Sequence, residues 1–199
     1  RDALSLDSDH TDTLNNLGNL LRDMGQSNDA LECYRRALAI SPDNPDTLNN
    51  LGSALMDSGQ TIEALATFDK ALRHAPDAAR LHNNKGLALY QLGHHARAEE
   101  AFKAALACDP DYAPAHANLG TSLNDLGQRT KAIAQFETAL LLAPDMADTH
   151  HRLARIKDFA PDDPQIAAMQ DLLEQPRLKP TDRMHLDYAL GKAMQDIGQ

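Results

Sequence analysis

The sequence predicts an all-α solenoid, in which a pair of helices repeats along the chain and each pair stacks on the next. The first observation is a period of 34 residues, and a period of this length is typical of a solenoid. Four glycines recur at this interval: Gly18, Gly52, Gly86 and Gly120. The second observation is that apolar residues recur at helical spacing in two blocks of each period, as Leu14, Leu17 and Leu21 do in the first block.

Five further positions recur with these glycines, which we number as position 8 of each repeat. Glycine at position 15 marks the end of the first helix, because a helix often ends on a left-handed residue that glycine adopts easily. Proline at position 32 ends the second helix, because it lacks the N–H group and clashes with the preceding turn. Alanines at positions 20 and 27 let the two helices approach, and a ring at position 24 fills the space between them. In the first repeat these residues are Gly25, Ala30, Tyr34, Ala37 and Pro42.

The N-terminal part of the chain divides into four complete repeats. They are expected at 11–44, 45–78, 79–112 and 113–146, and the first contains helices at about 12–24 and 28–41. Residues 1–10 are interpreted as the tail of a preceding helix, the second helix of an earlier repeat, because Ala3 and Leu6 fit positions 27 and 30. Pro45 opens the second repeat at a position where proline is tolerated.

The pattern loosens after residue 146. Residues 147–180 are interpreted as a divergent fifth repeat and a linker, with Lys157 at an apolar position and a helix at about 164–175. Residues 181–199 are interpreted as the first helix of a sixth, truncated repeat, with Thr181 as its N-cap. Because both ends cut through a repeat, we interpret the chain as a fragment of a longer protein.

The repeat resembles the tetratricopeptide repeat (TPR) family over residues 11–146. This resemblance implies a right-handed superhelical solenoid of antiparallel helix pairs, whose first helices line a concave groove with positions 2, 5, 6, 9, 12 and 13. The Leu-Asn-Asn-Leu motif at 14–17 and 48–51 is similar to that of the TPR array in O-GlcNAc transferase, where asparagines at position 6 hold a peptide backbone. Residues 161–198 are weakly similar to the link between TPR arrays and a sulfotransferase domain in some bacterial proteins.

Asparagines form the candidate peptide-binding site. Asparagine is unfavourable within a helix by roughly half a kcal/mol relative to alanine, so a repeated asparagine needs a reason. Its amide offers a donor and an acceptor, which match the N–H and C=O groups of an extended peptide. Contact with a ligand and a purely structural role, through bonds to neighbouring groups, both remain open. The candidates are Asn16, Asn50, Asn84 and Asn118 at position 6, Asn15, Asn49 and Asn83 at position 5, and the neighbouring Asn19, Leu87 and Tyr90.

The charge and the histidines limit other functions. A net charge of −10, from 29 acidic and 19 basic residues, disfavours nucleic acid and anionic membranes as partners. No stretch approaches the roughly 20 apolar residues of a membrane span, and we expect a cytoplasmic protein with two reduced cysteines, Cys33 and Cys108. His82, His116 and His150 recur at position 4, where we expect them to pack. We expect no metal site, since His150 and His151 lie on opposite sides of their helix.

The sequence contains no HExxH, GxSxG, P-loop or CxxC motif, so we expect neither catalysis nor a cofactor in this chain. The main hypothesis is a protein-interaction scaffold that binds an extended peptide or partner segment in the groove. One alternative is the substrate-recruiting or regulatory arm of a larger enzyme, a sulfotransferase or glycosyltransferase. A second alternative is a structural array that associates end to end, because Leu190, Met194 and Ile197 are expected to lack a partner helix.

Overall fold

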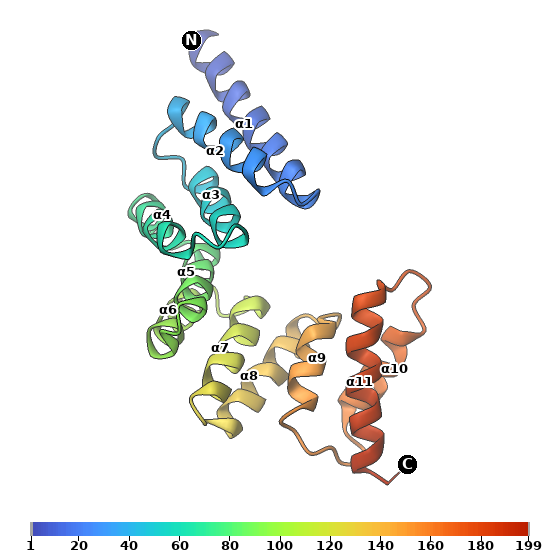
Figure 1. Ribbon diagram of the computed structural model, residues 1–199. Helices are drawn as coiled ribbons and strands as arrows, with labels where there is room; N and C mark the ends of the chain where they lie inside the picture. Colours follow the sequence, from blue (N-terminus) through green and yellow to red (C-terminus); the bar gives the residue numbers. More distant parts are fainter. Residues whose placement is uncertain (1, 199) are drawn as a thin grey trace. The chain divides into compact units, whose positions relative to one another are not determined.

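The computed structural model describes the backbone of residues 2–198 and the side chains of residues 10–198. Eleven helices and no strand occur within residues 2–198, which confirms the all-α class predicted from the repeat (Figure 1). The chain divides into two compact units, the first reaching Asp109 and the second beginning at Pro110. No helix among the described residues combines the length and the apolar character needed to cross a bilayer.

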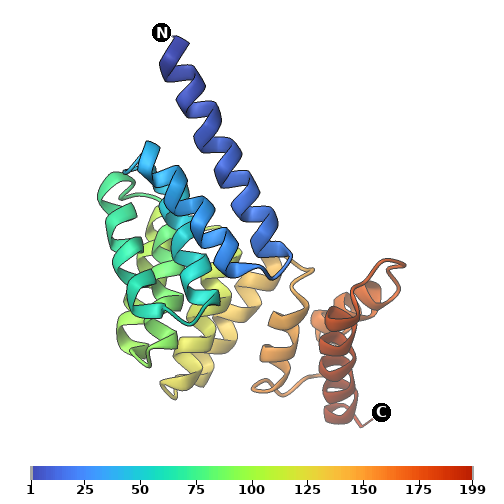
Figure 2. The ribbon, with the colours of Figure 1, turned by 45° about the horizontal axis from the view of Figure 1, so that its top comes forward.

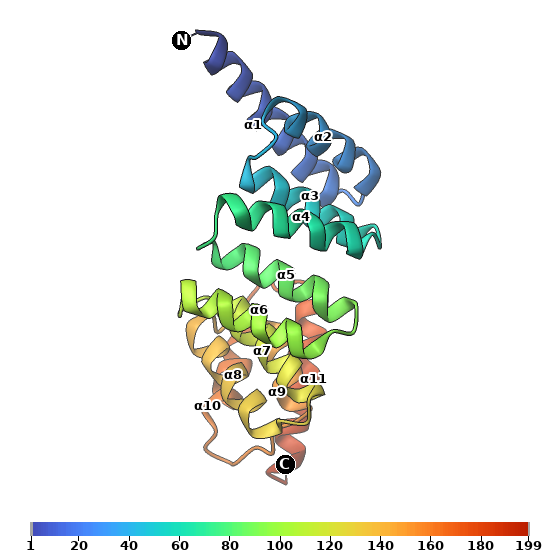
Figure 3. The ribbon, with the colours of Figure 1, turned by 90° about the vertical axis from the view of Figure 1, so that its left-hand side faces the viewer.

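The first unit consists of three helical hairpins. Each hairpin packs its two helices together, and α2 packs on α3 as α4 packs on α5. Figure 3 shows these hairpins stacked in chain order. The helices are α1 (Asp2–Asp23), α2 (Ser27–Ile40), α3 (Pro45–Asp57), α4 (Thr61–His74), α5 (Ala79–Gln91) and α6 (His95–Cys108).

The second unit begins with a fourth hairpin and ends in a different arrangement. Its helices are α7 (Ala113–Asp125), α8 (Arg129–Leu142), α9 (Ala147–Ala154), α10 (Pro164–Leu173) and α11 (Pro180–Asp196). Helix α11 packs mainly on α9 and also on α10, and the last helices lie side by side in Figure 2, drawn in orange to red.

The prediction that the last helix lacks a partner is therefore wrong. Leu190, Met194 and Ile197 are partly buried and pack against a core that includes Phe159 and Met169. The N-cap of this helix is Lys179 and not the expected Thr181, and the helix begins at Pro180, because proline suits the first helical position. The premise of end-to-end association through a bare α11 falls with this correction.

The structure also differs from the expectation for residues 1–10. A single helix runs from Asp2 to Asp23, with no turn between a preceding repeat and the first. The sequence supplies the reason, since Ser8 stands where the later repeats have the proline of position 32, and nothing there ends the helix. Arg1 and Gln199, and the side chains of residues 1–9, lie outside the described part of the chain.

A glycine that lies against a ring holds each of the four regular hairpins together. A Cβ atom added to Gly52 would lie 2.5 Å from Cε1 of Phe68, and one added to Gly86 would lie 2.5 Å from Cε1 of Phe102. Phe68 and Phe102 are fully buried. The glycine thus allows the first helix to approach the ring of the second more closely than any side chain would permit.

The glycine at position 15 ends each first helix as expected. Gly59 has a φ of 75°, in the left-handed region. Its N–H donates to the carbonyl of Met56, and the next N–H, of Gln60, donates to the carbonyl of Leu55. These two bonds satisfy the last carbonyls of the helix and reverse the chain within three residues. The two cysteines are free thiols, Cys33 buried and Cys108 exposed.

Candidate functional site

Five of the candidate asparagines form one chain of hydrogen bonds in the first unit, which we call the amide chain. Between repeats, Nδ2 of Asn84 donates to Oδ1 of Asn49 at 2.8 Å, and Nδ2 of Asn50 donates to Oδ1 of Asn15 at 3.1 Å. Within repeats, Asn83 donates to Asn84 at 3.3 Å and Asn49 donates to Asn50 at 3.4 Å. The amide chain therefore links α5, α3 and α1 through their side chains.

The two asparagine positions differ in burial. Asn49 and Asn83, at position 5, are each 3% exposed, and a buried amide must find hydrogen-bond partners within the protein. Asn50 and Asn84, at position 6, are half-buried. The amide chain supports a structural role at position 5, whereas Asn50 and Asn84 each have one donor and one acceptor engaged within it.

The remaining position-6 asparagines lie in different surroundings. Asn16, in the first repeat, is exposed on α1. Asn118 is half-buried on α7 of the second unit, where the position-5 residue is Ala117 in place of asparagine.

Asn19 faces the ring position of its own hairpin. The hydroxyl of Tyr34 donates to Oδ1 of Asn19 at 2.8 Å. The first repeat has tyrosine where the next three have phenylalanine, and Asn19 stands where they have Ser53, Leu87 and Thr121. The polar residue at position 9 is thus matched to the polar ring, and the Asn19 oxygen is already engaged by the protein.

Replacement of Tyr34 by phenylalanine is expected to remove a stability loss at alkaline pH. Burial raises the pKa of Tyr34, although the charge of Arg22 opposes this shift. Because the folded pKa lies above the unfolded value of about 10, the contribution of Tyr34 is complete below that pH and is lost as pH rises through the folded pKa. Urea unfolding at pH 7 to 11 should show the two proteins converging, from a difference of about 1 kcal/mol at pH 7 in favour of the wild type. A difference in the free energy of unfolding that stays constant from pH 7 to 11 would contradict the proposed contribution of the Tyr34 hydroxyl.

Leu87 and Tyr90 lie on α5, and both are half-buried. The Tyr90 ring meets His95 edge to face, with 5.0 Å between the ring centroids. The charges at the neighbouring first-helix positions pair with one another: Arg80 contacts Asp46 at 2.6 Å and Arg22 contacts Asp57 at 3.5 Å. These pairs offset part of the acidic charge of the first helices.

The histidines at position 4 have a structural task. Their Nε2 atoms lie 2.7–2.9 Å from a proline carbonyl at position 32 of the preceding repeat, so Nε2 carries the proton and donates. Burial lowers the pKa of His150, the most buried of the three, while its bond to Pro144 opposes the shift. The pairs are His82 with Pro76, His116 with Pro110 and His150 with Pro144.

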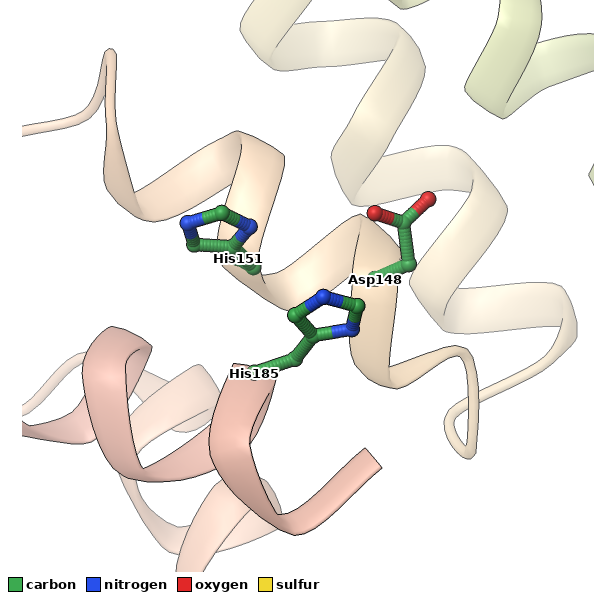
Figure 4. Close-up of side chains that lie close together, drawn as sticks. All are labelled: Asp148, His151 and His185. Atoms are coloured by element: carbon green, nitrogen blue, oxygen red, sulfur yellow. The ribbon is translucent and has the colours of Figure 1, made fainter. Parts of the chain in front are cut away.

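A second group, of Asp148, His151 and His185, was missed in the sequence. One ligand atom from each of the three side chains lies within 4.8 Å of the other two, and Figure 4 shows the side chains close together. The expectation that His151 has no ligand partner considered only His150, its neighbour on the same helix. His151 and His185 come from different helices, α9 and α11, and their proximity follows from the packing of α11 on α9, which no motif in the sequence indicates. Burial and the nearby His185 lower the pKa of His151.

Comparison with known proteins identifies the repeat. A family model described as TPR repeat matches residues 18–59, and two described as Tetratricopeptide repeat match residues 49–113 and 89–156. No protein among the curated sequences matches the chain.

Solved structures show the same fold. TTC0263, a thermophilic TPR protein of Thermus thermophilus, has a TM-score of 0.74 and 25% identity, over 90% of this chain and 98% of that one. PilF of Pseudomonas aeruginosa has a TM-score of 0.71 and 22% identity, over 97% and 79%. YrrB, described as a TPR protein with an unusual peptide-binding site, has a TM-score of 0.60 and 20% identity, over 98% and 90%.

Proposed function

Because the chain is a tetratricopeptide repeat protein, we propose that its first unit is an interaction scaffold that binds an extended peptide or partner segment along α1, α3 and α5. The observation that carries the proposal is the amide chain. It fixes the side chains of Asn50 and Asn84 one repeat apart, and it uses one of the two Nδ2 hydrogens and one of the two Oδ1 lone pairs of each. An amide so held has a donor and an acceptor left to match a peptide group.

The spacing of the helices suits an extended ligand. Packed helices lie about 8–10 Å apart, and an extended chain advances about 3.3 Å per residue. Amides one repeat apart would therefore meet every third residue of a bound peptide. Since each hydrogen bond contributes about 0.5–1.5 kcal/mol, the amides supply register, and contacts with side chains such as Leu87 and Tyr90 supply the remaining affinity.

The sign of the charge selects the ligand class. The chain carries a net charge of −10, while Arg22 and Arg80 are paired with acidic residues of neighbouring helices. A neutral or basic peptide avoids repulsion, and its backbone meets the amides whatever its sequence. Asn118 carries an amide at the same repeat position on α7 of the second unit.

The test uses an array of unstructured 12-residue peptides, neutral and basic, screened against the full chain. We expect the double variant Asn50→Ala with Asn84→Ala to lose about tenfold or more in affinity for the peptides that bind, since two amides contribute to each complex. The same peptides with N-methylated backbones should bind weakly to the wild type. Circular dichroism verifies that helicity is unchanged.

The matched control is the double variant Asn15→Ala with Asn49→Ala. It removes three of the four hydrogen bonds of the amide chain but leaves the position-6 amides in place. If both double variants lose affinity equally, the amides serve the fold and do not touch the peptide. Loss confined to the position-6 variant supports direct contact.

The described residues favour neither alternative hypothesis. None of their contacts supports the hypothesis of an arm of a larger enzyme. The hypothesis of end-to-end self-assembly assumed an unpartnered last helix, and α11 packs on α9 and α10.

A further inference from the structure

We propose that Asp148, His151 and His185 form a binding site for a divalent transition metal, Zn²⁺ being the ion best suited, which clasps α11 to α9. This inference is independent of the peptide-binding proposal, because all three residues lie in the second unit.

The backbone brings the three side chains together from two helices. Asp148 and His151 are three residues apart on α9, so they share one face of that helix. His185 comes from α11, next to Leu186, which is fully buried in the core between α9, α10 and α11. The position of His185 is therefore set by packing, and Figure 4 shows its ring beside that of His151.

The donor set has the chemistry of zinc. Two imidazole nitrogens and one carboxylate oxygen are common zinc ligands, and three protein ligands leave a fourth, open position for water. Magnesium and calcium prefer oxygen ligands, so the two imidazoles select against them. The site is partly exposed, with both histidines half-buried and Asp148 more open to solvent, and an ion can reach it from outside.

The geometry requires only rotation of side chains. In a tetrahedral zinc site with bonds of about 2.0–2.1 Å, ligand atoms lie roughly 3.4 Å apart, against a separation of up to 4.8 Å here. The rings of His151 and His185 are parallel within 4°, with their centroids 5.1 Å apart. Convergence on one ion therefore needs a turn of at least one imidazole about its Cα–Cβ and Cβ–Cγ bonds.

Neighbouring groups prepare the ligands. Nη2 of Arg152 contacts Oδ2 of Asp148 at 2.6 Å, and its Nη1 donates to Thr121 at 2.8 Å. This arrangement orients the carboxylate and leaves its Oδ1 for the ion, as outer partners of metal ligands commonly do. Tyr188 packs edge-on against the His151 ring, with 4.6 Å between centroids. Nδ1 of His185 is buried and makes no hydrogen bond within the described residues, which is a cost that coordination of an ion by this nitrogen would relieve.

The experiment titrates the full, metal-stripped chain with Zn²⁺ in a calorimeter and, in parallel, with Co²⁺ while the visible spectrum is recorded. We expect one site per chain, a Co²⁺ spectrum of tetrahedral intensity, and a higher unfolding temperature with Zn²⁺ that EDTA reverses. His185→Gln and Asp148→Asn should each weaken Zn²⁺ binding at least tenfold. Asp148 is exposed, so Asp148→Asn is expected to fold. It therefore tests the zinc site even if His185→Gln fails to fold.

His94→Gln is the matched control, because His94 is exposed in the first unit and belongs to a His94-His95 pair that could bind zinc adventitiously. It should leave affinity, spectrum and thermal shift unchanged. The proposal is overturned if Zn²⁺ does not bind, or if its affinity is unchanged in Asp148→Asn and His185→Gln, whatever His94→Gln does.

Discussion

Replacement of Phe68 by alanine is expected to lower the free energy of unfolding by about 3–5 kcal/mol. Phe68 is fully buried in the core of the first unit, among Leu51, Leu55 and Ala71. Its ring lies directly against Gly52, which has no side chain with which to fill the space that the ring leaves. The cavity term therefore adds to the lost transfer free energy. Guanidinium unfolding followed by circular dichroism measures the change.

The control for this prediction is Ile62→Ala on the same helix. Ile62 is 76% exposed, so its truncation should change stability by about 0.5 kcal/mol at most. A second check adds Gly52→Ala to each background. The new methyl group should destabilise the wild type through its contact with the ring, and it should be tolerated or favourable once the ring is gone. Equal effects of Gly52→Ala in both backgrounds would show that the glycine and the ring are not coupled.

Replacement of Lys157 by alanine is expected to destabilise the second unit by about 2–3 kcal/mol. Its Nζ contacts Oε1 of Glu137 on α8 at 2.6 Å and Oδ2 of Asp163 at 2.7 Å, and it lies 5.4 Å from the centre of the Phe159 ring. The Asp163 side chain is 8% exposed, so loss of the ammonium leaves a buried carboxylate without its charged partner. Asp163 also caps α10 by accepting from the N–H of Gln165, and the α10 region should loosen first.

Thermal unfolding and hydrogen exchange of the α10 amides test this prediction. Lys131→Ala on α8 is the control, since Lys131 is exposed and bonds to the side chain of Gln128, three residues earlier. Burial lowers the pKa of Lys157, but hydrogen bonds to Asp163 and Glu137 outweigh it and raise the pKa overall. The contribution of Lys157 is therefore complete below its unfolded pKa of about 10.4 and is lost as pH rises through the folded value. Equal stability of the Lys157 and Lys131 variants would contradict the stabilising role of the Lys157 ion pairs.

The regular hairpins could be predicted from sequence because their determinants are local. Gly59 needs a left-handed backbone whatever surrounds it, and Pro76 stops a helix without help from other residues. The length of α1 has the same explanation, because Ser8 occupies the proline position and does not end the helix. The break expected before Thr11 came from extending the 34-residue period towards the N-terminus, beyond Pro42, which is the first proline at that position.

The final helices could not be predicted in the same way. The packing of α11 on α9 depends on how Phe159, Met169 and Leu186 fill one core, and no repeat register specifies that contact. The same packing brings His185 to His151, so the proximity of these two side chains became visible only with the fold.

The asparagines show a second limit of prediction from sequence. Their spacing indicated that these residues have a role, but the sequence does not distinguish an amide that binds a ligand from one that bonds to a neighbouring residue. The structure shows the neighbours: Asn49 bonds to both Asn50 and Asn84. Contact of Asn50 and Asn84 with a peptide remains a prediction.

The contacts of the first unit also bear on how such a protein changes length during evolution. The glycine–ring contact closes inside one hairpin, whereas the amide chain joins each hairpin to the next. A tandem duplication of one 34-residue segment would carry its own glycine and ring, together with asparagines that continue the series on both sides. We expect an inserted copy of residues 45–78 to fold without compensating mutations. Gene duplication could then lengthen the asparagine-bearing surface by one repeat at a time.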